Sequence, residues 1–528
     1  MLLTKEQQAI IDILKSPESN NRIVAVNSVA GAGKTYTAKA IAEALKPASG
    51  LYTAYNKAIV EDSKKKIKNI DVRTLHSLAL RYSPNKKVDN FTYKSIKENI
   101  DYKEKRSIME LLEGFFLSSF LNLDDYANHK IIKEKFIIDN QTITLAKSYF
   151  SQMVDGSISA PFNFLLKFLH IKLHTSKKLN LGFKLKYDLV ILDECQDTTA
   201  VSFEIFKLID AEKKVILGDT YQNIYSFMNT VNAFELLDNN ILMHLTQSFR
   251  CRPEVAAVVE KYGKKLLNKD FKFTGTENIK TEIKTEAHLT RSNLSLIETM
   301  HSFHKQNRHY SLTRKIDDIF ELAVSIHEAN QGMNVTSKKY NFLEFEYNKF
   351  MFNAKNEVTF FDYLEILLGT DSDISRGIQL LKNLAVDNID IIQVKKQAEI
   401  MSDNPDVILT TAHTFKGLEA DIVYINDDLN ESLRVADSKK RDFYKKNKKD
   451  AKLPLEISNE LNLYYVALSR ARIKIENVSP LLDEENSINN NLNTINSFEA
   501  MLHGVYDINK NSAEEQSTKQ AHKFVDYW

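Results

Sequence analysis

The order of apolar and polar positions predicts short buried strands that alternate with helices. Arg22 to Asn27 (RIVAVN) form a short apolar run rich in β-branched residues. A Gly/Ala turn follows, and then a stretch with helical apolar spacing, TYTAKAIAEAL. Similar apolar runs recur at Tyr187 to Leu192, Lys214 to Leu217, Val407 to Thr410 and Ile422 to Ile425. This alternation is typical of α/β domains built on parallel sheets.

Two regions depart from the alternation and have helical patterning. The first lies between Ser77 and Lys186 and is rich in aromatic residues (IMELLEGFFLSSFL, FNFLLKFLHIKL), so we expect a helical subdomain inserted into the first sheet domain. The second runs from about Glu298 to Glu399; it is either another insertion or simply further helices of the second sheet domain. The tail from Asp483 begins rich in Asn and Ser, a composition typical of loosely ordered chain.

Length and charge narrow the class of protein. The 528 residues exceed the about 250 to 300 that a single core serves, and we expect about four subdomains. Lys and Arg (71) nearly balance Asp and Glu (70), so any surface for nucleic acid must be local. The run from Lys439 to Lys452 (KKRDFYKKNKKDAK) is one such local feature, although most charge runs are only solvated faces.

The number of cysteines and the first residues of the chain help to predict the cellular compartment of the protein. Only Cys195 and Cys251 are present, which excludes a disulfide framework and a four-cysteine metal site. The opening MLLTKEQQAI has no basic segment followed by an apolar stretch, and nowhere do about 18 uncharged apolar residues run together. We therefore expect a cytoplasmic protein of bacterial or phage type with no membrane partner.

The strongest candidate site is a phosphate-binding loop at Ser28 to Thr35 (SVAGAGKT), which stands between the predicted strand and helix. Lys34 would neutralise the β- and γ-phosphates of ATP, and the Thr35 hydroxyl would ligate Mg²⁺. Successive backbone N–H groups of such a loop cradle the polyphosphate, here those of Gly31, Ala32 and Gly33.

A second half of this site follows at Leu189 to Asp197 (LVILDECQD), where an apolar strand ends in adjacent carboxylates. Asp193 would ligate Mg²⁺, and Glu194 would orient and deprotonate the attacking water. Phosphoryl transfer also needs positive charge near the γ-phosphate. Arg250 (QSFR) and Arg470 (YVALSRA) are candidates, but spacing alone leaves open whether they reach the site or lie on the surface.

These motifs carry a family resemblance. The chain resembles the UvrD/Rep-like superfamily 1 (SF1A) DNA helicases, most closely their F-box DNA helicase branch, without a recognisable F-box. The resemblance extends from Leu3 to about Ile475. The further matching segments are LTKEQ (Leu3 to Gln7), LYTAYNKAIVED (Leu51 to Asp62), TLHSLA (Thr74 to Ala79), GDTYQNIYSF (Gly218 to Phe227), LTQSFR (Leu245 to Arg250), TTAHTFKGLEADIV (Thr410 to Val423) and ELNLYYVALSRAR (Glu460 to Arg472).

The resemblance implies roles for individual residues. At the nucleotide, Gln7 would read adenine, Phe249 would stack on it and Glu419 would hold the ribose. The γ-phosphate would be sensed or contacted by Gln222, Arg250 and Arg470. Tyr225 and Phe227 would stack on nucleic-acid bases, although without the family they would more often be core residues. The other implied contacts to nucleic acid are Tyr55, Thr74, His76, Arg291, Asn293, Thr411 and His413, of which the two histidines would by themselves more often be structural.

The resemblance also implies the architecture, namely two RecA-like parallel-sheet P-loop domains with helical insertions. Three positions depart from the family pattern: Tyr36 stands where many relatives have arginine, Tyr55 is one place later than the aromatic of UvrD, and Ser469 replaces threonine. The stretch between Arg250 and the fifth motif is short, so we expect a reduced 2B region. The expected ranges are 1–80 and 188–245 for 1A, 81–187 for 1B, 246–300 and 400–482 for 2A, 301–399 for 2B, and 483–528 for the tail.

The expected function is an ATP-dependent DNA helicase that translocates on single-stranded DNA, 3′-to-5′ by resemblance, and acts at single-strand/duplex junctions. A second hypothesis is that the protein is a translocase subunit that serves a nuclease or phage-defence complex and unwinds little by itself. A third is a non-catalytic, nucleotide-gated scaffold. Intact Lys34, Glu194, Arg250 and Arg470 argue against the scaffold.

Overall fold

The computed structural model describes residues 3–54, 57–129, 139–225, 230–353, 358–369, 373–448 and 451–483. The chain forms two units, Met1–Asn477 and Val478–Trp528. Of the second unit only the first residues are described, with the short helix η8 (Pro480–Leu482), so nearly all of the Asn-rich tail lies outside the described residues. The elements below belong to the first unit.

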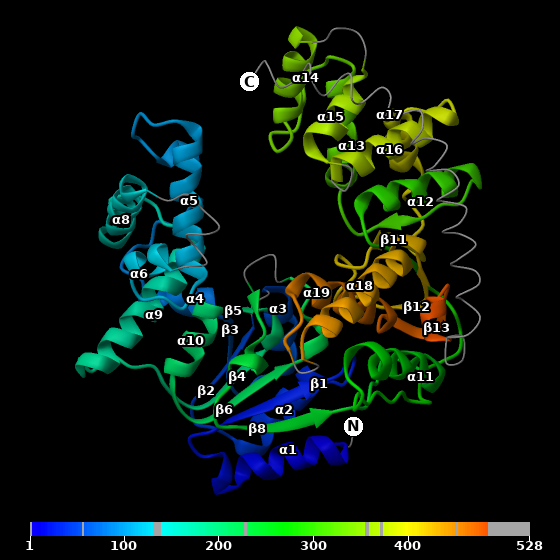
Figure 1. Cartoon of the computed structure of the whole chain (residues 1–528). Helices are drawn as coiled ribbons and strands as arrows, with labels where there is room; N and C mark the ends of the chain where they lie inside the picture. Colours follow the sequence, from blue (N-terminus) through cyan, green and yellow to red (C-terminus); the bar gives the residue numbers. More distant parts are fainter. Residues whose placement is uncertain are drawn as a thin grey trace. The chain divides into compact units, whose positions relative to one another are not determined.

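The first sheet domain is built on six strands in the order β3-β2-β4-β6-β1-β8, and every neighbouring pair is parallel (Figure 1). Its central strands are buried on both faces, with Val24, Ala25 and Val26 fully inaccessible to solvent. This burial explains the continuous apolar runs. The strands are β1 (Ile23–Ser28), β2 (Gly50–Ala54), β3 (Asp71–Thr74), β4 (Lys186–Asp193), β6 (Asp210–Gly218) and β8 (Asn240–Leu245).

Helices precede and connect these strands. The first begins at a capping box in which Thr4 and Gln7 bond reciprocally, and it buries Ile10, Ile11 and Leu14. A small antiparallel pair, β5 (Thr198–Thr199) and β7 (Thr230–Val231), flanks the sheet. The helices are α1 (Lys5–Lys15), α2 (Lys34–Leu45), α3 (Lys57–Lys66), α4 (Leu75–Tyr82) and α10 (Ala200–Leu208), with short turns η1 (Pro17–Ser19), η3 (Cys195–Asp197), η4 (Thr220–Gln222) and η6 (Ala233–Leu236).

A helical segment stands between α4 and β4, where the aromatic-rich pattern predicts one. Phe115, Phe116 and Phe164 are buried at its centre, and the same core continues into Leu51 and Val190 of the first sheet. The segment is therefore packed onto that sheet rather than tethered to it. Its elements are η2 (Tyr93–Ser95), α5 (Tyr102–Leu117), α6 (Leu123–Asn128), α8 (Asn140–Asp155) and α9 (Phe162–Leu179).

The second sheet domain has five strands in the order β10-β11-β9-β12-β13, again parallel throughout. Both sheets thus confirm the predicted α/β class. The strands are β9 (Glu286–Thr290), β10 (Ser311–Leu312), β11 (Val407–Thr411), β12 (Ala420–Ile425) and β13 (Ala471–Glu476). The accompanying helices are α11 (Pro253–Tyr262), η7 (Gly263–Leu267), α12 (Asn293–Lys305), α18 (Asp427–Lys446) and α19 (Leu455–Leu468).

Five further helices follow β10 and share one core with α12. Ile326, Leu364 and Leu384 from these helices pack in the same buried cluster as Ile297 of α12 and Leu409 of β11. The stretch is thus continuous with the second sheet domain, and the edge strand β10 lies beyond residue 300, where the expected insertion begins. The helices are α13 (Ile316–Asn330), α14 (Phe342–Asn353), α15 (Phe360–Leu368), α16 (Asp373–Val386) and α17 (Ile391–Met401) (Figure 1).

Candidate nucleotide and nucleic-acid sites

The phosphate-binding loop connects the carboxyl end of β1 to α2 and requires glycine at two positions. Gly31 has φ 75° and Gly33 has φ 79°, a region that side chains with a Cβ disfavour. A Cβ on Gly31 would also lie 2.5 Å from Ser248 Oγ and 2.6 Å from Arg250 Cβ. The Phe249 N–H donates to the Gly31 carbonyl at 2.9 Å. The loop therefore rests directly against the segment that follows β8.

Lys34 and Glu194 meet at the centre of the site. The Lys34 Nζ lies 3.1 Å from Glu194 Oε1, and both side chains are largely buried. Glu194 adopts a left-handed backbone conformation, φ 51°, directly after β4 ends at Asp193. Its N–H donates to Asp193 Oδ1 at 2.8 Å, and the Tyr52 hydroxyl donates to Asp193 Oδ2. These bonds hold two adjacent carboxylates in different orientations.

The two carboxylates differ in their proton affinity. Burial, together with the neighbouring Glu194 charge, raises the pKa of Asp193. Burial acts the same way on Glu194, but Lys34 and Lys416 outweigh it and hold the pKa of Glu194 below its ordinary value. Burial lowers the pKa of Lys34, whereas Glu194, Asp193 and Asp219 raise it, with a net rise. Lys34 and Glu194 are thus both charged at neutral pH.

Gln7 and Phe249 both lie close to Gly33. A Cβ on Gly33 would be 3.7 Å from the Gln7 amide nitrogen and 3.7 Å from a Phe249 ring carbon, with the Tyr36 Cβ at 3.8 Å. Gln7 is buried and donates from Nε2 to Thr37 Oγ1 at 3.0 Å. An amide and an aromatic ring thus stand beside the amino end of α2, where Thr35 lies partly exposed in the first turn.

The two predicted arginines lie near each other beside the loop. Arg250 donates from Nε to Glu419 Oε2 at 2.8 Å and from Nη1 to the Ser469 carbonyl at 3.1 Å. Arg470 is 1% exposed and donates to the Val466 carbonyl at 3.0 Å. Burial and the charge of Arg250 lower the pKa of Arg470 to about 9. Glu419, predicted to hold a ribose, is bound to Arg250 in this structure.

Helix α19 of the second sheet domain also contacts the loop and the predicted sensor. The Tyr465 hydroxyl donates to Asp219 Oδ2 at 2.8 Å and accepts from the Ala30 N–H at 3.1 Å. Gln222 donates from Nε2 to the same Asp219 oxygen at 2.8 Å. Asp219 therefore joins the sensor glutamine of one domain to a phenol of the other. The arrangement is a phosphate loop and carboxylates from one sheet domain faced by cations and a phenol from the next.

Comparisons with known proteins agree with this geometry. A family model described as an AAA domain matches residues 10–228. F-box DNA helicase 1 of Gallus gallus is 26% identical over 516 residues, which cover 89% of this chain and 48% of that protein. F-box DNA helicase protein 1 of Schizosaccharomyces pombe is 23% identical over 535 residues, covering 90% of this chain and 57% of that protein.

Because these alignments cover 89% and 90% of the chain, they extend over both sheet domains. The chain is similar to these F-box DNA helicases over most of its length, and the AAA-domain model matches the part that contains the phosphate-binding loop and the carboxylates at the end of β4. The chain spans about half the length of the relatives it matches. The match to an AAA domain, together with the phosphate-binding loop, implies nucleotide binding at this loop. Within the described part of the chain, no helix combines the length and apolar character needed to cross a membrane.

Three residues with expected nucleic-acid roles lie near one another. The Tyr225 hydroxyl donates to the His413 carbonyl at 3.1 Å. His413 and Arg291 line one pocket of about 660 Å³, to which Arg376 and Lys439 also contribute. Arg291 is paired with Glu460, at 2.6 Å from its NH2 group, and burial lowers the pKa of His413 to about 4. The lysine run thus begins at a concave, partly basic surface.

The remaining expected nucleic-acid residues are dispersed over both domains. Thr74 caps α4 by accepting from the Ser77 N–H, and the His76 ring bonds Asn163 at 3.0 Å. Thr411 ends β11, where its hydroxyl bonds Thr414 at 2.9 Å, and Asn293 is the first residue of α12. Tyr55 and Phe227 lie outside the described residues.

Several residues at the site were assigned no role from the sequence. Tyr52 bonds the predicted metal ligand, and Tyr465 and Asp219 link the two domains at the loop. Asp197 and Lys416 form an ion pair between the domains. Each lies within a motif that carries the resemblance but away from the positions with familiar roles. Their position inside those motifs was the only available signal.

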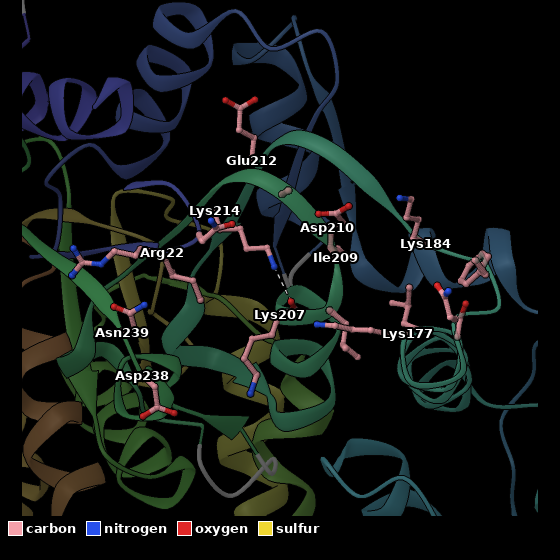
Figure 2. A pocket seen from close by; sticks show the side chains of 18 of the residues that line it. Arg22, Lys177, Lys184, Lys207, Ile209, Asp210, Glu212, Lys214, Asp238 and Asn239 are labelled. Carbon is pink, nitrogen blue, oxygen red and sulfur yellow. Dashed lines mark hydrogen bonds between the residues drawn. The ribbon is translucent and has the colours of Figure 1, made fainter. Parts of the chain in front are cut away.

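A separate pocket of about 490 Å³ lies at the opposite end of the first sheet from the loop (Figure 2). It is lined by the amino ends of β1 and β6, whereas the loop follows the carboxyl end of β1. Figure 2 shows Lys214 turned toward the Lys207 carbonyl, to which it donates at 2.7 Å. Lys207 pairs with Glu204, and Arg22 donates to the Asn240 carbonyl. This pocket is therefore distinct from the nucleotide site.

Proposed function

We propose that this protein is an ATP-dependent DNA helicase that moves on single-stranded DNA, 3′-to-5′, and unwinds duplexes at junctions during DNA repair, recombination or replication. The observation that carries the proposal is the meeting of two sets of groups. Lys34 and Glu194 of one sheet domain face Arg470 of the other, with Arg250 between the sheets. The relatives are named as DNA helicases, which supports DNA as the substrate.

ATP would bind with its phosphates on the loop and its base between Gln7 and Phe249. The backbone N–H groups of Gly31, Ala32 and Gly33 would contact the phosphates beside the start of α2, where the helix dipole favours anions. The hydroxyl of Thr35 and the buried carboxylate of Asp193 are the hard oxygen ligands that suit Mg²⁺. When bound, Mg²⁺ supplies positive charge to the phosphates.

Hydrolysis then requires a base and charge stabilisation. Glu194 stays ionised because Lys34 and Lys416 lower its pKa, so its carboxylate can orient and deprotonate a water. Arg250 and Arg470 would stabilise the charge that develops on the γ-phosphate, and Gln222 would sense that phosphate. Because the cations and the base come from different domains, turnover depends on their approach.

Nucleic acid would lie along the surface that contains Tyr225, His413 and Arg291. An aromatic ring stacks on any base, which suits a motor that must pass every sequence. Thr74, His76, Asn293 and Thr411 would complete the contacts, together with Tyr55 and Phe227. Arg291 would exchange its Glu460 partner for a phosphate. We propose that the first sheet domain is 1A (1–80 and 188–245) and its helical segment 1B (81–187). The second sheet domain would be 2A (246–300 and 400–482), and the helices after β10 would be 2B (301–399).

The test measures ATP hydrolysis with single-stranded DNA, with single-stranded RNA and without nucleic acid, followed by unwinding of duplexes with a 3′ or a 5′ tail. We expect stimulation by DNA and unwinding from a 3′ tail. Lys34→Ala should abolish hydrolysis. Unstimulated hydrolysis, or unwinding from the 5′ tail alone, would contradict the proposal or its polarity respectively.

A second candidate is a translocase subunit that serves a nuclease or a phage-defence complex and separates strands poorly alone. The apolar side chains exposed on α14 and α15 favour it, since Phe345, Phe352 and Ile366 are 67%, 91% and 78% exposed. Exposed apolar side chains that gather on neighbouring elements mark protein interfaces. Stimulated hydrolysis with no unwinding from either tail would support this candidate.

A further inference from the structure

Lys416 crosses from the second sheet domain into the first. It lies in the turn between β11 and β12, and its side chain is only 10% exposed. Its Nζ donates to Asp197 Oδ2 and to the Gln222 carbonyl, the latter at 2.6 Å. Both acceptors belong to the first sheet domain. One ammonium group therefore binds the carboxylate motif and the predicted phosphate sensor at the same time.

The same ammonium group contacts the expected nucleic-acid surface. Lys416 Nζ lies 4.7 Å from the centre of the Tyr225 ring, a distance at which a cation is attracted to the aromatic face. Tyr225 also donates to the carbonyl of His413, and the Lys416 N–H donates to that carbonyl at 3.3 Å. A shift of the Tyr225 ring would therefore change the contacts of Lys416.

Asp197 connects this lysine to the predicted base. Asp197 accepts from Gln196 Nε2 at 3.3 Å, and the same amide donates to Glu194 Oε2 at 2.6 Å. The Asp197 N–H donates to the Glu194 carbonyl at 2.9 Å. The contacts thus form one unbroken chain: Tyr225, Lys416, Asp197, Gln196 and Glu194.

We propose that Lys416 is a positioning residue that couples occupation of the strand site to the orientation of Glu194, through its ion pair with Asp197. The inference rests on the proposed function, because it assigns Tyr225 to strand binding. A base stacked on Tyr225 fixes the ring beneath the ammonium group. Lys416 then holds Asp197, and the Gln196 amide holds the Glu194 carboxylate toward the water.

The test is the ratio of DNA-stimulated to basal ATP hydrolysis in Lys416→Met, which keeps the chain length and removes the charge. We expect this ratio to fall by about tenfold or more, within the usual range of coupling between sites, while the affinity for a fluorescent ADP analogue changes little. Lys416→Arg, which can keep both the charge and the Asp197 pair, should restore most of the ratio. Lys395→Met is the matched control, because Lys395 pairs with Asp317 at 2.6 Å on the helical segment.

A double-mutant cycle tests the route. Asp197→Asn should lower the ratio like Lys416→Met, and the double variant should be no worse than either single variant. Additive losses would overturn the route through Asp197. Equal loss of basal and stimulated turnover, or an unchanged ratio, would overturn the coupling role. If the unaltered protein shows no stimulation by DNA, the proposed function fails first, so the two failures are distinguishable.

Discussion

The two sheet domains are alike in topology and opposite in the charges that they bring to the site. Both are parallel sheets with helical crossovers. The first contributes Asp193, Glu194, Asp197 and Asp219, gathered around a single lysine. The second contributes Arg470 and Lys416. The carboxylates nearest Lys34 thus come from the first domain, whereas Arg250, Arg470 and Lys416 come from the second.

The pKa values of these carboxylates and arginines reflect how the charges are distributed between the two domains. Burial raises the pKa of Asp219 and of Asp193, whose Glu194 neighbour adds to the rise, as expected for crowded carboxylates. Burial and Arg250 lower the pKa of Arg470 to about 9, as expected for crowded cations. Each domain therefore carries like charges that are costly alone and that the other domain can offset. The comparison suggests four tests, from the largest expected effect to the smallest.

The largest effect should come from removing a second-domain cation. Arg470→Ala should lower DNA-stimulated kcat by about 10³-fold, because arginines supplied to a γ-phosphate typically contribute 10³ to 10⁵. Single-turnover hydrolysis measures this effect. Arg434→Ala, which removes an exposed arginine paired with Glu431, is the control. Loss of activity in both variants would mean that the second domain does not supply a specific cation.

Removing the first-domain base should have a smaller effect. Glu194→Gln keeps the size of the side chain, and a general base typically contributes 10² to 10⁴, so we expect a loss of about 10²-fold in kcat. Binding of ATP, measured by equilibrium fluorescence, should persist because Lys34 is retained. Glu254→Gln, at an exposed position on α11, should be neutral. Retained hydrolysis in Glu194→Gln would mean that another residue is the general base.

The aromatic residue beside the domain boundary should affect the strand and spare the nucleotide. Tyr225→Ala should weaken binding of single-stranded DNA by about 1–3 kcal/mol, the usual contribution of stacking per base. Tyr225→Phe keeps the ring and removes the hydroxyl that bonds the His413 carbonyl, so its binding should stay close to that of the unaltered protein. Fluorescence anisotropy measures both. Equal binding by all three proteins would place the strand elsewhere.

Acid should destabilise both domains through buried histidines. Burial, with nearby Lys167, lowers the pKa of His170 to about 3, and burial with Arg308 lowers that of His288 to about 4. Below pH 6.5 the unfolded chain binds protons that the folded chain does not, so stability falls by up to about 1.4 kcal/mol per pH unit for each histidine. Thermal melts between pH 7 and 5 should show a falling Tm, and His170→Gln should flatten the slope. A Tm that rises on acidification would contradict this sign.

The sequence predicts the local parts of the site well. Val24, Ala25 and Val26 are buried on both faces, and this burial makes β1 a continuous apolar run that can be recognised. Glycines with positive φ and carboxylates at the end of β4 are likewise local signals. The ends of the strands are harder to predict from the sequence. Strand β6 begins at Asp210, four residues before its apolar run, because its first residues lie toward solvent. The two residues of β10 are too few for a pattern.

Contacts between distant segments could not be predicted in this way. Lys416 and Asp197 are 219 positions apart, and nothing in either motif specifies that they pair. The Tyr52 hydroxyl reaches Asp193 only because β2 and β4 are neighbours, which is a property of the sheet order rather than of either strand. The bond between Arg250 and Glu419 is similar, since it joins residues that were predicted to serve different parts of the nucleotide.

The bond between Ala30 and Tyr465 bears on how this molecule can be divided. The Ala30 N–H is buried at the start of the phosphate loop and finds its acceptor 435 residues further along the chain. A truncated protein that lacked α19 would keep the loop but lose that acceptor, and the Ala30 N–H would bond to water instead. The first sheet domain alone therefore lacks one of the bonds that hold the phosphate loop. Chimaeras that exchange domains should exchange α19 together with the loop.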